Sequence, residues 1–120
     1  MKITLIKILV LSVITMLCFS SCEKRDVPSG TPNCIKIKIE QIKSDEVRNP
    51  PASVWRYDYN GQTVYYIPQY CCDMPSELYD ADCNLICSPD GGFSGTGDNK
   101  CTDFFSKRTK KKLIWQDDRK

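Results

Sequence analysis

The sequence contains no histidine. Histidine is the usual general base at neutral pH and the commonest transition-metal ligand, so its absence excludes Ser-His-Asp and Cys-His catalytic pairs and histidine-based metal sites. A membrane-spanning helix needs an apolar run of about 20 residues, and the chain also lacks such a run. Its longest such run is Ile8–Phe19, which is too short. We therefore expect neither a membrane-spanning protein nor an enzyme.

The N-terminus has the plan of a secretory signal. Lys2 and Lys7 precede the apolar run, and Ser20-Ser21-Cys22 follows it like a bacterial lipobox. This predicts a lipoprotein signal peptide over residues 1–21, with Cys22 diacylated on sulfur (typically with palmitate). The chain would then be exported and held by lipid on a membrane of the bacterial cell envelope, in the periplasm or at the cell surface. The alternative is an ordinary signal peptide with a stray cysteine.

The chain has little net charge once this leader is removed. The whole sequence has 17 basic and 15 acidic residues, and loss of Lys2 and Lys7 leaves 15 of each. A near-neutral protein lacks the positive field that attracts polyanions. This balance argues against nucleic acid or an anionic lipid surface as the main partner.

The mature chain divides into a polar tether and one domain. Residues 22–33 are polar and rich in proline and glycine, which predicts a flexible tether. The domain, 34–120, opens with a segment of ambiguous period, Cys34–Glu46. Its isoleucines fit either strand alternation or one stripe of a helix. The abundance of Lys, Glu and Gln favours a short amphipathic helix.

The clearest local signal is a β-hairpin. Aromatic and β-branched residues at 54–59 and 62–67 flank Asn60-Gly61, the pair that best suits a two-residue hairpin turn. Further elements are expected as a second hairpin over 77–87, a turn of helix at 103–107 and a last strand at 110–117. Together they predict a small α+β fold: one N-terminal helix packed on a short antiparallel sheet built from hairpins, with disulfide staples.

Six cysteines follow the lipobox: Cys34, Cys71, Cys72, Cys83, Cys87 and Cys101. In an exported chain an even number predicts three disulfides. Neighbours in an extended chain point to opposite sides, so Cys71 and Cys72 are expected to take different partners, preferably in the 83–87 hairpin and at Cys101. The full pairing stays open. A zinc site usually shows two Cys-x-x-Cys pairs, and a redox-active dithiol usually shows one. This spacing does not occur in the sequence.

The segment 88–100 is a glycine-rich loop bracketed by Cys87 and Cys101. One interpretation is a closed Ω-like loop with no function of its own. The functional interpretation is a surface presented to a partner, since closure by a disulfide lowers the conformational entropy that the loop loses on binding. Its candidate binding residues are Asp90, Gly91, Gly92 and Phe93.

A second functional class is a calcium- or carbohydrate-binding accessory protein. Asp80, Asp82 and Asn84 copy the first three ligand positions of an EF-hand loop, which suggests calcium as the one candidate cofactor. The match then fails, because Leu85 replaces the obligatory glycine and Gly91 the bidentate glutamate; Asp and Asn are also ordinary turn formers. The carbohydrate alternative depends on an aromatic set: Trp55, Tyr57, Tyr59, Tyr65, Tyr66 and Tyr70.

Several motifs lie within 63–119: VYYI-P, CCD, LYD, IC-PDGG, G-GD and C-DF, then a terminal I-W-D-R. With them the chain resembles an uncharacterised family of small bacterial lipoproteins that carry a domain of unknown function. The resemblance implies a secreted, lipid-anchored domain and brings no activity. Cys83 departs from the pattern, where glycine is the more usual residue. We expect a non-enzymatic envelope lipoprotein that binds a protein or glycan partner through the 88–100 loop.

Overall fold

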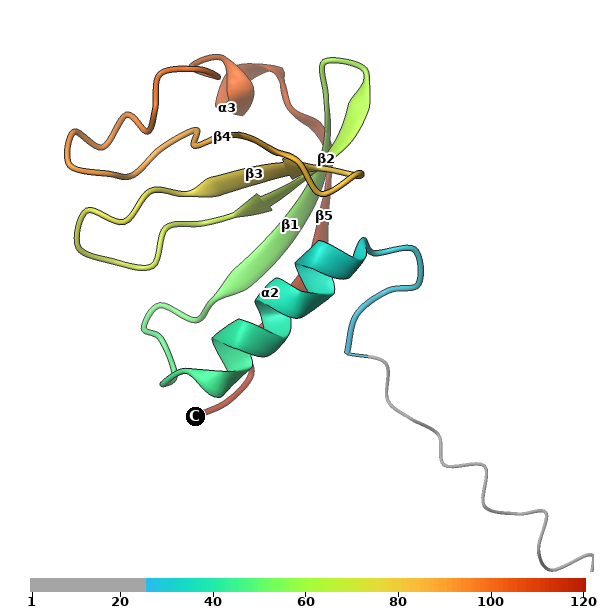
Figure 1. Ribbon diagram of the computed structural model, residues 1–120, viewed down its shortest axis with the longest axis vertical. Coiled ribbons are helices and arrows are strands. Elements are labelled where there is room, and N and C mark those ends of the chain that lie inside the picture. The colour runs from blue at the N-terminus through green and yellow to red at the C-terminus, as the bar shows by residue number, and fades with distance from the viewer. Residues whose placement is uncertain (1–25) are drawn as a thin grey trace, which may run out of the picture.

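The computed structural model describes residues 26–120, so the predicted signal peptide and Cys22 lie outside the described part. One principal helix packs against a five-stranded sheet with the strand order β4-β3-β2-β1-β5 (Figure 1). No helix within 26–120 is long and apolar enough to cross a membrane. The elements, in chain order, are α2 (Asn33–Ser44), β1 (Ser53–Tyr59), β2 (Gln62–Ile67), β3 (Glu77–Asp80), β4 (Leu85–Cys87), α3 (Phe104–Lys107) and β5 (Thr109–Gln116). The predicted small α+β fold is confirmed.

The segment after the tether, whose sequence fits either a strand or a helix, forms the helix α2. Ile35, Ile39 and Ile42 fall on one stripe and are buried against the sheet, the first two with no exposed surface. At its C-terminal end the Arg119 guanidinium donates to the carbonyls of Lys43 (2.7 Å) and Ile42 (3.2 Å). These bonds cap the last turn of the helix, where the Ile42 carbonyl also accepts a hydrogen bond from the Asp45 amide (3.2 Å).

The hairpin of β1 and β2 has the register that the sequence predicts. Tyr59 pairs with Gln62 across a two-residue loop, in which Asn60 and Gly61 have φ of 50° and 75°. Positive φ at both positions is what a type I′ turn requires. β2 continues the sheet by pairing with β3, and β5 pairs with the outer edge of β1. The second hairpin, the turn of helix and the last strand are present within one residue of their expected bounds.

The sheet is covered on both faces. Along β2, Tyr65 and Ile67 join the cluster that contains α2, whereas Val64 and Tyr66 join a second cluster around Phe104 of α3. Successive residues of a strand point to opposite faces, so the two clusters lie on either side of the sheet. The helical turn α3 therefore supplies a second layer, and no local pattern in the sequence predicts it.

Residues 26–32, the described part of the predicted tether, lie against the domain. Val27 packs on the α2 cluster, and the buried Thr31 donates from its hydroxyl to the carbonyl of Pro28 (2.8 Å). Lys43 Nζ lies 2.6 Å from a carboxylate oxygen of Asp26. This part of the chain is thus held by α2 rather than extending freely from it.

Two disulfides staple the fold, where three were predicted. Cys34–Cys83 joins the start of α2 to the β3–β4 turn, and Cys87–Cys101 closes the base of the glycine-rich loop. The prediction that Cys71 and Cys72 take separate partners is wrong, because both are exposed free thiols. Their expected partners, Cys83, Cys87 and Cys101, belong to these two bridges.

Candidate functional site

Two long loops lie together at one end of the sheet: 68–76, between β2 and β3, and 88–100, after β4 (Figure 1). Backbone bonds join them. The Gly92 amide donates to the Met74 carbonyl (3.2 Å), and the Ser76 amide donates to the Asp90 carbonyl (3.0 Å). A bridge between Pro75 and Gly91 lies between these two bonds. We refer to 68–76 and 88–100 together as the two-loop surface, because their backbones form one connected unit.

The glycine-rich loop has its shape fixed from within. The Gly97 amide donates to the Gly91 carbonyl (2.9 Å), and the Asp98 amide donates to the Ser88 carbonyl (3.0 Å). Gly97 has a φ of 68°, and a Cβ there would stand only 1.8 Å from the Ser88 carbonyl oxygen. Only glycine fits this position. Together with Cys87–Cys101, these contacts hold the loop in one conformation.

Asp90, predicted as a binding residue, points into the fold. Its Oδ1 accepts a hydrogen bond from the hydroxyl of the buried Tyr66 (2.8 Å), and its amide donates to Ser76 Oγ (3.1 Å). Burial raises the pKa of Tyr66 far above its usual range, and the bond to the Asp90 carboxylate raises it further. Asp90 therefore anchors the loop to the core. Gly91 is buried in the same junction and cannot act as an open contact surface.

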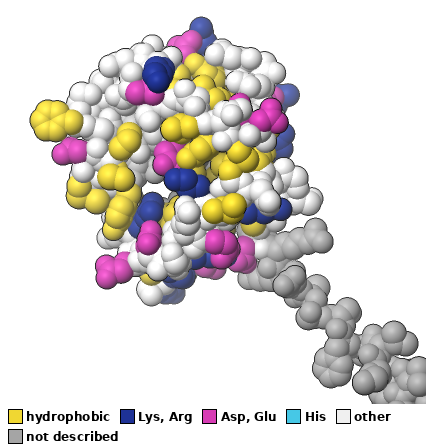
Figure 2. Space-filling model, in the orientation of Figure 1, with side chains coloured by type: hydrophobic (Ala, Val, Ile, Leu, Met, Phe, Trp, Pro, Cys, Tyr) yellow, Lys and Arg dark blue, Asp and Glu magenta, His cyan; other side chains and the backbone are white. Residues whose placement is uncertain are grey.

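Phe93 projects from the anchored loop with 95% of its surface exposed. Met74 and Tyr70, on the other loop, are 53% and 45% exposed. In the space-filling view, hydrophobic side chains gather on the side of the molecule where these loops lie (Figure 2). Large apolar side chains that cluster on a surface mark a site of interaction more often than single ones do. Of the four predicted binding residues, Phe93 is the one presented fully to solvent, and its neighbour Gly92 is half-buried.

Two hollows flank this apolar group. The larger, of about 710 Å³, lies between the loops and is lined by Tyr70, Cys71, Cys72 and Phe93 among others. The smaller, of about 230 Å³, lies between α2 and the 68–76 loop. Tyr70 belongs to the lining of both, so its ring forms part of the wall between them.

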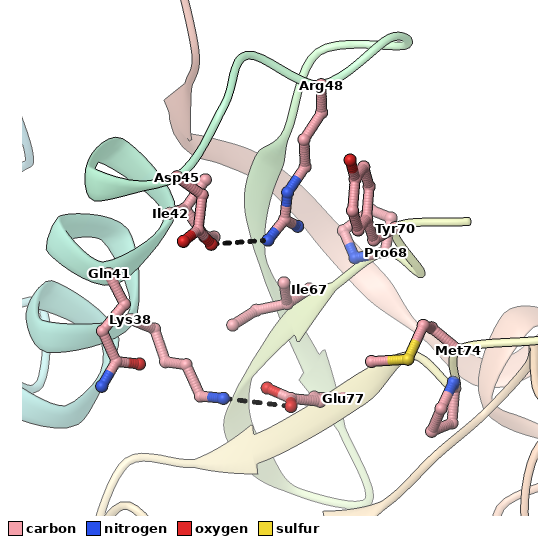
Figure 3. A pocket seen from close by; sticks show the side chains of 11 residues that line it. Lys38, Gln41, Ile42, Asp45, Arg48, Ile67, Pro68, Tyr70, Met74 and Glu77 are labelled. Atoms are coloured by element: carbon pink, nitrogen blue, oxygen red, sulfur yellow. Dashed lines mark hydrogen bonds and ion pairs between the residues drawn. The ribbon is translucent and has the colours of Figure 1, made fainter. Parts of the chain in front are cut away.

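The smaller hollow is bordered by two cations (Figure 3). Lys38 Nζ lies 3.1 Å from Glu77 Oε1, and an Arg48 nitrogen lies 3.8 Å from Asp45 Oδ2. The Arg48 guanidinium also stacks over the Tyr70 ring at 4.3 Å from its centroid. Its Nε is buried and has no hydrogen-bond partner among the described residues. The hollow thus has an apolar wall and a rim of two ion pairs, in which each cation is matched by a carboxylate.

Arg48 and Met74 were not predicted as site residues, and Tyr70 was predicted only as a member of the aromatic set. They lie in irregular segments where no periodic pattern separates exposed from buried positions. The nearest signal was the pair of prolines, Pro68 and Pro75, which bracket the loop and argue against a continuous strand.

The acidic turn joins β3 to β4. Asp80 Oδ1 accepts bonds from the backbone amides of Asp82 and Asn84 (both 2.9 Å), and Oδ2 accepts one from the Asn84 side chain (3.0 Å). The hydrogen bonds from Asn84 lower the pKa of Asp80, with a further contribution from the Asp82 amide. Over residues 26–120, no three His, Cys, Asp or Glu side chains converge as a metal site would require. The Asp80 carboxylate serves the turn itself.

The aromatic set belongs mainly to the core. Tyr57 and Tyr59 pack edge-on against Phe104, with ring centroids 5.6 and 5.3 Å apart from it. Tyr65 and Tyr66 are buried on opposite faces of β2. Tyr70 is the member of the set that contributes an exposed ring to the two-loop surface.

The model of one protein family, described as a domain of unknown function (DUF6970), matches residues 40–117. The chain belongs to the DUF6970 family. No curated protein and no solved structure matches it. The DUF6970 region includes all five strands and the whole two-loop surface, but it begins within α2 and after Cys34. The Cys34–Cys83 bridge therefore fastens a segment outside the family region to a turn inside it.

Proposed function

We propose that this DUF6970 chain is a non-enzymatic lipoprotein of the bacterial cell envelope that binds a protein partner through the two-loop surface. The lipobox-like sequence before Cys22 supports export and lipid anchoring. The absence of histidine from the sequence supports a binding role over acid–base catalysis. The anchored apolar loops support a protein as the partner, because aromatic and methionine side chains are enriched where proteins meet.

The observation that carries the proposal is the setting of Phe93. Its ring is 95% exposed, yet its loop is fixed by a disulfide, by internal backbone bonds and by the Tyr66–Asp90 contact. A rigid loop loses little conformational entropy when a partner binds, so more of the contact energy appears as affinity. Burying a Phe side chain in an interface is worth roughly 1.5–3 kcal/mol.

The chemistry of the partner follows from the neighbours of Phe93. An apolar side chain of the partner would contact Phe93 and Met74, beside the hollow whose rim carries the ion pairs Lys38–Glu77 and Arg48–Asp45. Both cations are paired with carboxylates, and the buried Nε of Arg48 is closed to a partner. We therefore favour a segment with a hydrophobic residue flanked by polar side chains.

Site-directed photo-crosslinking in the native envelope tests this function. A photoreactive phenylalanine analogue at Phe93 should give one dominant adduct with an envelope protein. The same analogue at Leu85 is the matched control, because Leu85 is 56% exposed but lies on β4 outside the two loops. Phe93→Ala should weaken capture of that protein about ten- to hundredfold. Equal adducts from both positions would contradict the proposal.

The anchor is tested separately. Cys22→Ser should move the protein from the membrane fraction to the soluble fraction, because two or three acyl chains are needed for stable attachment. A serine variant that stays in the membrane would refute lipid anchoring at Cys22. It would leave the crosslinking result unaffected, so the two parts of the function are judged independently.

A further inference from the structure

Cys71 and Cys72 form an adjacent pair of thiols in the 68–76 loop. Of the six cysteines in the part of the chain that the structure describes, the other four are paired in disulfides, and these two are free. Both side chains are exposed and both line the hollow of about 710 Å³ beside Phe93. An oxidant or a disulfide in solution therefore has direct access to them.

The backbone at this pair is folded rather than extended. Cys72 and Asp73 have φ of 52° and 66°, and the Met74 amide donates to the Cys71 carbonyl (3.0 Å). In an extended strand the two side chains would point to opposite sides. The left-handed conformation at Cys72 removes that separation, and the two thiols interact. A hydrogen bond that the Cys71 thiol donates to Cys72 raises the pKa of Cys71, while nearby Arg48 acts in the opposite direction.

We infer that Cys71 and Cys72 are a redox site, which a disulfide oxidant converts reversibly from a dithiol into a disulfide between the two neighbours. One cysteine thiolate attacks a sulfur of the oxidant, forms a mixed disulfide and releases the first thiol. The second cysteine, as thiolate, then attacks its neighbour's sulfur and displaces the second thiol. Two S–H bonds are lost, one S–S bond forms between Cys71 and Cys72, and the oxidant's disulfide takes up two electrons and two protons.

The product should be easy to reduce again. Adjacent Cα atoms lie about 3.8 Å apart, closer than in ordinary disulfides, so the ring that the disulfide closes is strained and its S–S bond more reducible.

The raised pKa of Cys71 means that little thiolate is present near neutral pH. Oxidation should therefore accelerate as the pH rises through the alkaline range. This chemistry goes beyond partner binding and does not depend on it.

Equilibration of the full chain with oxidised and reduced glutathione tests the inference. At each ratio, free thiols are trapped by alkylation and located by tandem mass spectrometry. We expect Cys71 and Cys72 to lose reactivity together, with loss of two hydrogen atoms from that segment and no retained glutathione. Raising the proportion of reduced glutathione should restore both thiols. Cys87–Cys101, which is buried, serves as the internal reference that stays oxidised.

Cys71→Ser and Cys72→Ser are the matched controls, since each leaves one thiol that cannot close the ring. Each variant should retain one glutathione at ratios where the wild type retains none. Because both positions are exposed, the urea midpoints of the variants should match that of the wild type. Three results would overturn the inference: thiols that stay reduced where the single-cysteine variants react, a stable glutathione adduct on the wild type, or bridges from Cys71 or Cys72 to another cysteine or a second chain.

Discussion

Removal of the Cys34–Cys83 bridge gives the most quantitative prediction. The two residues are 49 positions apart, and closing a loop of that size lowers the entropy of the unfolded chain by the equivalent of about 4 kcal/mol. A small domain has a total unfolding free energy of about 5–15 kcal/mol, so the loss is a large fraction of the whole. Cys34→Ala with Cys83→Ala should lower the unfolding free energy by about 4 kcal/mol.

The conformation of Cys83 adds a second, finer prediction. Its φ is 69°, in the left-handed region that costs an L-residue about 1 kcal/mol or more and glycine almost nothing. Cys34→Ala with Cys83→Gly should therefore lose only about 3 kcal/mol, and should be more stable than the double-alanine variant.

Urea denaturation followed by tryptophan fluorescence measures both differences, because Trp115 is buried in the cluster that contains α2. The slope of free energy against urea should rise in both variants, since an unfolded chain without the bridge exposes more surface. A glycine variant that is less stable than the alanine variant would refute the reasoning about φ. Equal stability of the bridged and unbridged proteins would refute the entropic account of the staple.

Three further predictions concern the loop, the helix end and the acidic turn. Gly97→Ala should destabilise the protein clearly more than Gly95→Ala in thermal melts. Positive φ costs an alanine about 1 kcal/mol at either position, but of the two only position 97 would also place the new Cβ against backbone atoms. Arg119→Ala should lower the urea midpoint and make that midpoint depend less on pH in the acid range. Hydrogen bonding to Arg119 lowers the pKa of Asp117 in the folded protein, so the stability from this pair is present above the ordinary Asp pKa and is lost as the pH falls through the folded pKa. Calcium at millimolar concentration should leave the melting temperature unchanged, because both carboxylate oxygens of Asp80 are occupied by the turn; a rise would indicate a calcium site.

The order and type of the elements could be predicted because their signals are local. Asn60-Gly61 specifies a two-residue turn by its own backbone preferences, and the flanking aromatic residues then pair in one register. In the same way, three isoleucines at helical spacing define the buried stripe of α2. Neither signal depends on contacts with distant parts of the chain.

The disulfide pairing could not be predicted, because it depends on which distant segments meet. Cys34 reaches Cys83 only because α2 lies across the sheet near the β3–β4 turn. The inward direction of Asp90 has the same origin, since it depends on a tyrosine 24 residues away. The disulfide pairing and the direction of Asp90 thus both come from tertiary contacts, which local residue chemistry does not specify.

The position of Phe93 lies outside both hydrophobic clusters of the fold, as the proposed binding role requires. One face of the sheet is closed by α2 and the other by Phe104, which has no exposed surface and contacts three tyrosine rings. Neither cluster includes Phe93. Phe104→Ala should therefore cost about 3–5 kcal/mol of stability, whereas Phe93→Ala should change it by less than about 0.5 kcal/mol. Any loss of partner capture in the second variant would then be a property of the two-loop surface. If instead Phe93→Ala proved as unstable as Phe104→Ala, its ring would belong to the energetics of the core and would no longer support a role in binding.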